Sequence, residues 1–355
     1  MQHIDEILKA AVDSGVTDVF VIAGSPVAYK NKGAITPRDG DMIMPEAAEV
    51  LIRNLYDIAG RDISRLMSAG DDDFAFSIAG VSRFRASTYK QRGSLAAVIR
   101  VISFGIPDYA ALGIPERVIK SADKASGLVL VTGPAGSGKS TTLACMIDHI
   151  NERRGGHIIT LEDPIEYLHR NKKCIISQRE VALDTVSYVS ALRACLRQAP
   201  DVILVGEMRD FETIQTVMTA AETGHLVIST LHTVGAADTV DRIIDVFPPS
   251  QQQQVRIQLS MLLQAVISQQ LIPTLSGQQK PAFEIMYMNT AIRTLIRESK
   301  IHQIDSAIAS GASDGMVSMD ASLLALRTAG DITNESALHY ASNADMMTKR
   351  MAALK

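Results

Sequence analysis

The fold of this chain is decided by residues 133–141, Gly-Pro-Ala-Gly-Ser-Gly-Lys-Ser-Thr. The stretch follows an apolar run, residues 128–132, and precedes apolar residues at helical spacing. A glycine-rich turn that leaves a strand and enters a helix at Lys-Ser is the pattern of a phosphate-binding loop. This stretch therefore predicts an α/β fold that binds a nucleotide triphosphate.

Each part of this loop has a chemical task. Glycine lets the backbone turn tightly, so that its N–H groups face phosphate oxygens, and the next helix adds its N-terminal donors. We expect Lys139 to reach the β- and γ-phosphates of ATP and the Ser140 hydroxyl to bind Mg²⁺. A glycine-rich turn without a ligand is the alternative, and it leaves the lysine and the adjacent hydroxyl unexplained. The expected nucleotide-binding residues are Gly133, Pro134, Ala135, Gly136, Ser137, Gly138, Lys139, Ser140 and Thr141.

Composition excludes several classes of protein. The net charge of -4 provides no global basic field for nucleic acid. The three cysteines are scattered without a Cys-x-x-Cys pair, which argues against a disulfide framework and a zinc site. Charged residues at 5, 6 and 9 interrupt any signal peptide, and no apolar run is long enough to span a membrane. We expect a cytoplasmic protein that binds no nucleic acid.

The first 104 residues have the pattern of a small α+β domain. Apolar residues recur at helical spacing over 4–12, and strands are expected at 18–23, 74–78 and 81–90. Asn31-Lys32-Gly33 suits a hairpin turn. Residues 105–115 contain two prolines and two glycines, so we interpret them as a linker.

Residues 116–285 alternate between strand and helix patterns. Strands are expected at 128–132, 157–161, 202–206 and 226–231, and Asp210 is placed to cap a helix. This alternation predicts a mainly parallel sheet flanked by helices, with the ligand at the carboxyl ends of its strands. After Pro248-Pro249, Ser250 is expected to cap a helix whose apolar stripe contains Leu259, Leu262, Leu263, Val266 and Ile267. Residues 286–355 are expected to form a C-terminal helical region.

Carboxylates follow two of the expected strands. Glu207 comes after the apolar strand at 202–206, where nucleotide hydrolases need an acid that holds Mg²⁺ or orients water. The alternative is a carboxylate at a helix start. Glu162 and Asp163 end another strand, and Pro164 favours extended backbone at Asp163. The two side chains then point to opposite faces, so only one faces the metal directly. Turn-forming Asp-Pro chemistry is an equal alternative.

The histidines and arginines indicate a function less specifically than the phosphate loop and the carboxylates do. On residue type alone, His225 and His232 are better interpreted as satisfied core or surface residues than as γ-phosphate contacts. Four arginines crowd the end of the first domain, where a solvated face is the ordinary interpretation. An arginine supplied by a neighbouring subunit to a γ-phosphate is the functional alternative. These four arginines are Arg83, Arg85, Arg92 and Arg100.

Taken together, these motifs resemble the PilT-type pilus retraction ATPases, within the larger family of type II and type IV secretion ATPases. The resemblance covers nearly the whole chain in order: residues 84–100 resemble the arginine segment, 131–142 the phosphate loop, 162–166 and 205–210 the acidic motifs, and 223–233 the histidine box. Residues 291–298, Ala-Ile-Arg-Thr-Leu-Ile-Arg-Glu, resemble a signature of retraction motors. Without the resemblance, they are an amphipathic helix with three exposed charges.

The resemblance implies a RecA-like P-loop core with a PAS-like N-terminal domain, assembled as a homo-hexamer. It implies that Arg85 and Arg100 approach the phosphates, Glu207 acts as base, Glu162 orients water or metal, and His232 senses the phosphate. Glu207 and Asp163 are expected to hold Mg²⁺ through water. The implied partner is an inner-membrane pilus platform protein, which places the chain at the inner face of the cytoplasmic membrane.

The chain departs from the family pattern in three places: Asp18-Val19-Phe20-Val21, Gln198-Ala199-Pro200-Asp201 and Ala135. None removes an expected catalytic group. The expected function is an Mg²⁺-dependent ATPase motor for type IV pilus retraction. Its rivals are a slow nucleotide-gated regulatory or assembly relative and an ATPase for secretion or DNA translocation.

Overall fold

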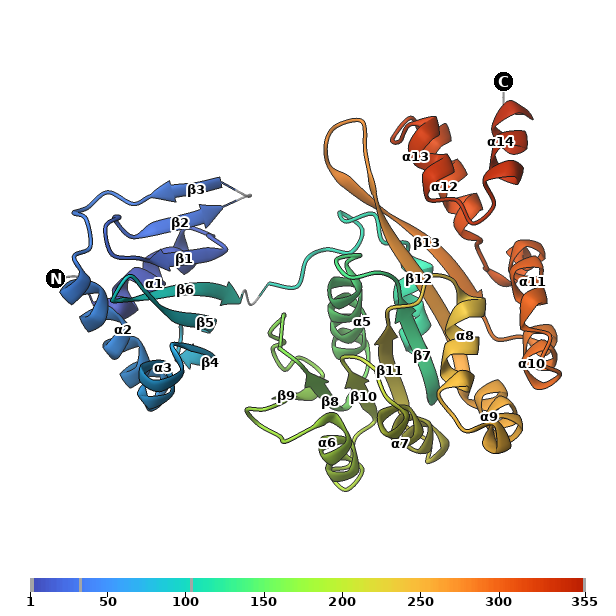
Figure 1. Ribbon diagram of the computed structural model, residues 1–355. Helices are drawn as coiled ribbons and strands as arrows, with labels where there is room; N and C mark the ends of the chain where they lie inside the picture. Colours follow the sequence, from blue (N-terminus) through green and yellow to red (C-terminus); the bar gives the residue numbers. More distant parts are fainter. Residues whose placement is uncertain (1–2, 32–33, 103–104, 354–355) are drawn as a thin grey trace. The chain divides into compact units, whose positions relative to one another are not determined.

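The computed structural model describes residues 3–31, 34–102 and 105–353. The chain forms two compact units that divide between Gly105 and Ile106 (Figure 1). Each unit has its own hydrophobic core.

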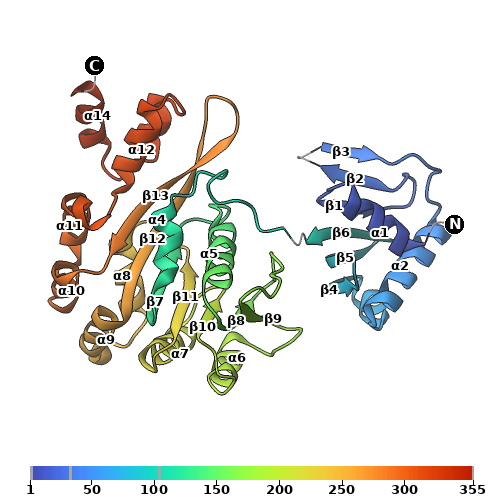
Figure 2. The same ribbon diagram turned by 180° about the vertical axis from the view of Figure 1, so that it is seen from behind.

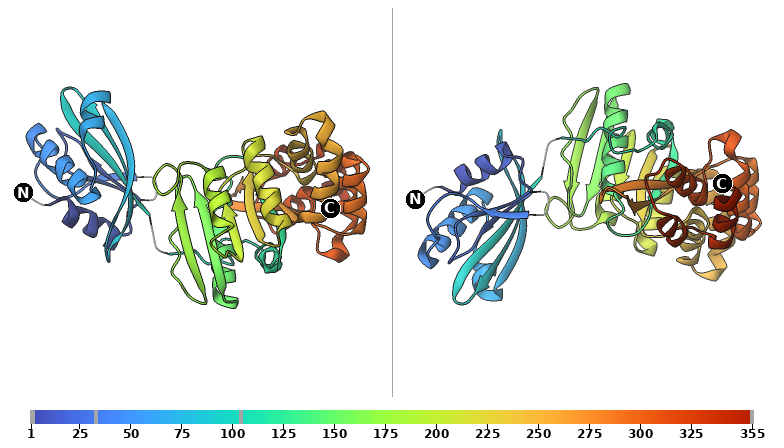
Figure 3. Two further views of the ribbon diagram at one scale, coloured as in Figure 1. Left: turned by 90° about the horizontal axis from the view of Figure 1, so that it is seen from below. Right: turned by 90° about the horizontal axis from the view of Figure 1, so that it is seen from above.

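The first unit is an antiparallel six-stranded sheet with the strand order β3-β2-β1-β6-β5-β4. Its helices α1 and α2 pack on one face of this sheet (Figure 3). The elements are α1 (Ile4–Asp13), β1 (Asp18–Val21), β2 (Ala28–Asn31), β3 (Ala34–Pro37), α2 (Pro45–Ala59), α3 (Ser64–Ala69), β4 (Asp71–Ile78), β5 (Ser82–Gln91) and β6 (Ser94–Ile102). This arrangement confirms the α+β class.

Strand β5 follows the alternation that the sequence predicts. Phe84, Ala86 and Thr88 are buried, whereas Arg85 and Ser87 are exposed, because successive side chains of a strand point to opposite faces. At the expected hairpin, β2 and β3 pair up to Asn31 and Ala34. The turn residues Lys32 and Gly33 lie outside the described residues.

The second unit is built on a seven-stranded sheet with the order β13-β12-β7-β11-β10-β8-β9, in which only β13 runs antiparallel to its neighbour. The mainly parallel sheet is therefore confirmed. Its elements before the C-terminal helices are α4 (Glu116–Lys120), β7 (Gly127–Thr132), α5 (Lys139–Arg153), β8 (Gly156–Glu162), β9 (Cys174–Glu180), α6 (Tyr188–Cys195), β10 (Val202–Val205), α7 (Phe211–Glu222), β11 (Leu226–Leu231), α8 (Ala236–Asp245), α9 (Pro249–Leu262), β12 (Leu263–Pro273) and β13 (Gln279–Tyr287).

Helices cover both faces of this sheet (Figures 1 and 2). Alternate residues of β7 point into the two halves of the core: Val129 and Val131 pack with α4 and α5, and Leu128 and Leu130 pack with the helices α6 to α9. The loop between β7 and α5 thus leaves the middle of the sheet at its carboxyl edge.

One sequence expectation is wrong after residue 262. Helix α9 ends at Leu262, and Leu263, Val266 and Ile267 belong to β12 instead of a continuous helical stripe. Both patterns put apolar residues close together, so spacing alone does not separate a fully buried strand from a helix. The α9 helix also starts without a side-chain cap, so Ser250 does not play the expected part.

The C-terminal helices follow β13 and gather at the β12–β13 end of the second unit (Figure 3). They are α10 (Thr290–Arg297), α11 (Ile304–Ser310), α12 (Met319–Thr328), α13 (Asn334–His339) and α14 (Ala344–Ala353). Across the part of the chain that the structure describes, no helix combines the length and apolar character needed to cross a bilayer.

Candidate active site

The loop at residues 133–141 has the backbone of a phosphate cradle. Gly133, Gly136 and Gly138 have φ angles of 139°, 75° and 87°, a region that side chains with a Cβ rarely adopt. Gly138 is the residue before the first turn of α5, so the free N–H groups of that turn face the loop. A Cβ on Gly133 would lie 2.1 Å from the backbone oxygen of Gln269, and only glycine fits there.

Gln269 on β12 holds this loop, a role that the sequence pattern does not predict. Its amide oxygen accepts a hydrogen bond from the Thr142 hydroxyl at 2.7 Å, and its amide nitrogen donates to the Ser137 carbonyl at 2.7 Å. Gln269 is buried, so both contacts are shielded from water. The apolar spacing of this segment suggests a helix, whereas it forms the strand β12. The available signal for Gln269 is a polar residue inside a long apolar run.

Lys139 lies inside the cradle. Its ammonium group donates to the carbonyl oxygens of Gly133 and Pro134 at 2.8 Å each, and it lies 3.5 Å from Nδ1 of His232. In P-loop proteins, the lysine of this motif reaches the β- and γ-phosphates.

The cradle fits a chain of phosphates. The Ser137 hydroxyl is buried and has no hydrogen-bond partner among the described residues. A buried polar atom without a partner costs free energy, which a phosphate oxygen would recover. Next to it, a Cβ placed on Gly136 would meet open space, so the outer side of the loop is accessible.

Glu207 lies beside the cradle and carries two basic neighbours. One carboxylate oxygen is 2.7 Å from Nε of Arg209, and the other is 3.3 Å from Nε2 of His232. Its side chain is only 13% exposed. His232 thus stands between Lys139 and Glu207, and it connects the loop to the second acidic motif. Arg209 was not expected from the sequence, although it lies two residues from Glu207.

His225 lies apart from this group and confirms its ordinary interpretation. Its Nδ1 is 3.0 Å from the Thr223 hydroxyl and 3.0 Å from the Ala220 carbonyl, at the end of α7. These contacts explain the residue as part of a helix end.

The first acidic motif follows β8, next to β10 in the sheet. Glu162 accepts hydrogen bonds from Thr160 at 2.6 Å and from Gln178 at 3.2 Å, whereas Asp163 is exposed. Burial raises the pKa of Tyr188 above its ordinary range, and the negative charges of Glu207, Asp163 and Glu162 raise it further. Tyr188 therefore stays protonated beside the carboxylates of both acidic motifs.

Tyr188 also explains why glycine precedes Glu207. A Cβ on Gly206 would lie 2.9 Å from the Tyr188 hydroxyl, closer than real Cβ contacts allow. Glycine at this position leaves room for the tyrosine at the ends of β8 and β10.

The donor set suits Mg²⁺ bound together with phosphates. Ser140, Asp163 and Glu207 supply hydroxyl and carboxylate oxygens, the ligands that Mg²⁺ prefers. Within the described ranges, no group of three or more His, Cys, Asp or Glu residues is placed to hold a metal by itself.

The expected arginines lie in the first unit. Arg85 on β5 and Arg100 on β6 are direct cross-strand partners, and both are exposed. Nε of Arg100 lies 3.0 Å from the Asp18 carboxylate on β1. Two guanidinium groups therefore share one face of the sheet.

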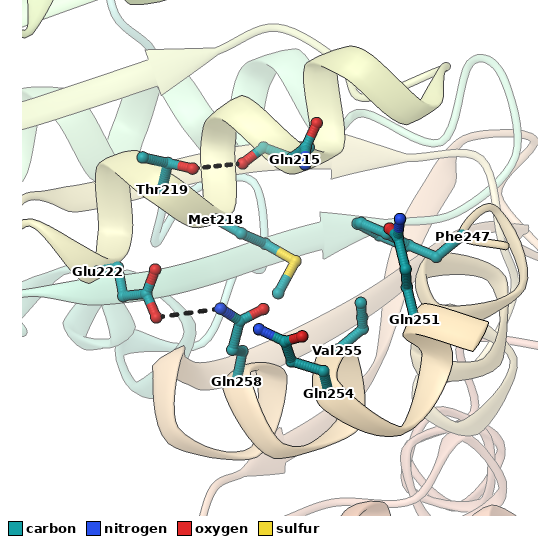
Figure 4. A pocket seen from close by; sticks show the side chains of 9 residues that line it. All are labelled: Gln215, Met218, Thr219, Glu222, Phe247, Gln251, Gln254, Val255 and Gln258. Atoms are coloured by element: carbon teal, nitrogen blue, oxygen red, sulfur yellow. Dashed lines mark hydrogen bonds between the residues drawn. The ribbon is translucent and has the colours of Figure 1, made fainter. Parts of the chain in front are cut away.

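A separate hollow of about 300 Å³ lies between α7 and α9, and it contains none of these residues (Figure 4). Glutamine amides surround an apolar floor, and the Gln258 amide donates to Glu222 at 3.2 Å. It is distinct from the site that the cradle forms.

Comparison with known proteins identifies the family of this chain. The model of one family, described as type II/IV secretion system protein, matches residues 1–330. The chain belongs to the type II/IV secretion system protein family.

Within this family, the chain is similar to the type IV pilus retraction ATPase PilT of Pseudomonas aeruginosa, with 44% identity over 94% of this chain and 96% of the relative. It is 50% identical to a twitching motility protein of Neisseria gonorrhoeae over 78% of this chain and 74% of that protein. A crystal structure of the pilus retraction motor PilT with bound ADP matches with a TM-score of 0.89 and 45% identity, over 98% of this chain and 100% of that chain. The PilT-type resemblance, the α/β fold and ATP hydrolysis as the class of activity are confirmed.

Proposed function

We propose that this chain is an Mg²⁺-dependent ATPase motor that powers the retraction of a type IV pilus. One observation carries the proposal: His232 lies 3.5 Å from Lys139 and 3.3 Å from Glu207, so the phosphate loop, the second acidic motif and the histidine box form one site. The similarity to PilT over 94% of the chain supplies the biological context.

The proposed chemistry follows from these positions. Lys139 exchanges the Gly133 and Pro134 carbonyls for phosphate oxygens when ATP binds. Mg²⁺, when bound near Ser140, Glu207 and Asp163, neutralises charge on the β- and γ-phosphates. Glu207 takes the proton of the attacking water, and Glu162, held by Thr160 and Gln178, orients that water or the metal.

His232 is well placed to sense the terminal phosphate in this scheme. Its two ring nitrogens face the lysine that binds the phosphate and the carboxylate that acts as base. Loss of the γ-phosphate changes the charge beside Lys139, and His232 is the side chain in contact with both partners.

The proposal includes assembly and partners. We propose a homo-hexamer in which Arg85 and Arg100 of one copy serve the phosphates bound by another copy, and a pilus platform protein of the inner membrane as the partner. The shared, exposed face of the two arginines supports a role outside their own fold. An arginine supplied to the phosphates in this way raises the rate by about 10³–10⁵.

The first test is ATP hydrolysis by the purified chain. Glu207→Gln is expected to bind ATP and to lose at least about 100-fold in kcat, because the base is gone. Lys139→Ala is expected to lose nucleotide binding itself. Lys124→Ala changes an exposed lysine before β7 and serves as the matched control. Full turnover by Glu207→Gln would remove Glu207 as the base.

The second test separates retraction from assembly. Deletion of the gene is expected to leave cells with excess pili and no twitching, and the Glu207→Gln form is expected not to restore motility. Cells without pili would show that the motor assembles fibres, and the retraction proposal would then be wrong.

A further inference from the structure

The helix that follows His232 depends on distant residues for its start. The residue immediately before α8 is Gly235, which has no side chain to cap the helix. The Ser268 hydroxyl on β12 accepts the Gly235 N–H at 2.9 Å, and one carboxylate oxygen of Glu284 on β13 accepts the Ala236 N–H at 2.8 Å. The sheet therefore holds the end of the loop that carries His232.

These contacts are aligned in a row across the sheet. Ser268 pairs in register with Thr132 on β7, the last residue before the phosphate loop, and with Glu284 on β13. The Thr239 hydroxyl of α8 lies 2.7 Å from that of Thr233 and 3.5 Å from that of Thr132. Thr132, Ser268 and Glu284, on three adjacent strands, thus connect the residue before the phosphate loop with the end of the loop that carries His232.

The second carboxylate oxygen of Glu284 faces the C-terminal helices. It lies 3.5 Å from the backbone N–H of Met319, at the start of α12. The segment before α12 is also bound to β13, because Ile285 and Val317 exchange two backbone hydrogen bonds of 2.8 and 3.0 Å. One buried carboxylate, 5% exposed, therefore contacts the starts of two helices.

The starts of both helices affect the ionisation of this carboxylate. Burial raises the pKa of Glu284 above its ordinary value, the carboxylates of Asp305 and Asp320 raise it further, and the N–H groups of Ala236 and Met319 offset part of this rise. The positive ends of two helix dipoles stabilise the negative charge. Removal of either helix start would leave a buried oxygen of Glu284 without its hydrogen-bond partner, which costs free energy.

We propose that Glu284 is a positioning residue that sets the His232 loop and couples it to α12. The proposal rests on ATP hydrolysis at the site described above. A shift of the His232 loop on phosphate loss moves the Ala236 N–H, and the shared carboxylate transmits that shift to Met319. Helices α12 to α14, which follow the segment 291–298 in the chain, thereby respond to the nucleotide.

The kinetic test compares two variants that both weaken the start of α12. Glu284→Ala removes the contacts to α8 and α12, and kcat is expected to fall about tenfold while KM stays within about twofold. Ser318→Ala removes the side-chain cap of α12 alone, which accepts the Ala321 N–H, and leaves α8 untouched. Its kcat is expected to stay within about twofold of the wild type. Equal kcat losses in both variants, or a wild-type kcat in Glu284→Ala, would overturn the proposal.

The coupling is tested by hydrogen exchange of the intact protein with and without a non-hydrolysable ATP analogue. Glutamine at 284 offers one acceptor oxygen, so Glu284→Gln is expected to keep the shorter contact to Ala236 and lose the one to Met319. The wild type and Ser318→Ala are expected to show a nucleotide-dependent change in exchange at residues 319–328, and Glu284→Gln to show none. A retained change in Glu284→Gln contradicts the coupling. This readout needs binding only, so a wild type that binds the analogue without turnover would refute the proposed function separately.

Discussion

At the scale of single residues, the stability of the first unit depends on one buried carboxylate. Asp72 on β4 accepts hydrogen bonds from the Arg61 guanidinium at 2.9 Å and from the Tyr56 hydroxyl at 3.1 Å. Burial alone would raise the pKa of Asp72, but the bonds from Arg61 and Tyr56 and the charges of Arg61 and Arg65 outweigh it, so the pKa lies below its ordinary value. Asp72 is therefore charged and stabilising at neutral pH.

Asp72→Asn is expected to lower the free energy of unfolding by about 1.5–3 kcal/mol, the range for hydrogen bonds to a charged group. Because the pKa is lowered in the folded state, this stabilisation is complete above the unfolded pKa of about 3.9 and is lost as the pH falls below it. Urea unfolding from pH 7 to pH 3 measures both effects. Asp73→Asn, at an exposed position of the same strand, is the control, and an equal loss there would contradict the assignment.

The close approach of Gly206 to the Tyr188 hydroxyl leads to a second prediction for single residues. Gly206→Ala is expected to displace the tyrosine ring, at a cost of about 1–3 kcal/mol for overpacking, and to lower kcat. Tyr188→Phe removes the hydroxyl that a new Cβ would meet, so the double variant is expected to recover part of the loss. Additive losses in unfolding and in ATP hydrolysis would show that the two sites do not interact.

At the scale of elements, β12 connects the two halves of the site because its residues alternate between faces. Gln269 holds the phosphate loop on one face, and its neighbour Ser268 holds the start of α8 on the other. The helix before this strand, α9, is fastened at its own end. Arg293 of α10 donates to the carbonyl of Ser260 and, at 3.1 Å, to that of Met261.

Arg293 gives a structural role to the segment 291–298, whose charges were all expected to be exposed. A cation at the free carbonyls of a helix end satisfies them and is favoured by the helix dipole. Arg293→Ala is expected to cost about 1–2 kcal/mol and to speed hydrogen exchange at the end of α9. Arg297→Ala removes the exposed arginine of the same helix and is expected to cost less than about 0.5 kcal/mol. Similar effects of both variants would contradict the cap.

At the scale of the whole molecule, the proposed shared site makes a prediction about mixtures. Arg100→Ala and Lys139→Ala are each expected to be inactive alone, the first for lack of the arginine and the second for lack of the lysine. In mixed assemblies, the loop of the first meets the arginine of the second, and ATP hydrolysis is expected to return in part. Mixtures that stay inactive at every ratio, although the subunits assemble together, would show that no site is shared between copies.

The sequence alone predicts those features that depend on residues close together in the chain. The phosphate loop, the cap of α7 by Asp210 and the alternation along β5 follow from residue types at fixed spacing. The segment after Leu262 is a fully buried strand, and its continuous apolar run does not show the alternation that separates a strand from a helix. For this reason the sequence does not predict the role of Gln269 on that strand. Tyr188 and Glu284 carry no local signal, since their partners lie 18 or more residues away.

Residue order by itself determined the class of the core, the glycine-rich loop before α5 and the carboxylates at the strand ends, because a turn, a helix start and a strand end are built from neighbours. Only the tertiary structure decided which side chains surround that place. His232 reaches both Lys139 and Glu207 because β11 lies between β7 and β10. Glu284 caps α8 because β12 and β13 pair next to β7, and side-by-side pairing of strands is settled by the packing of the whole sheet.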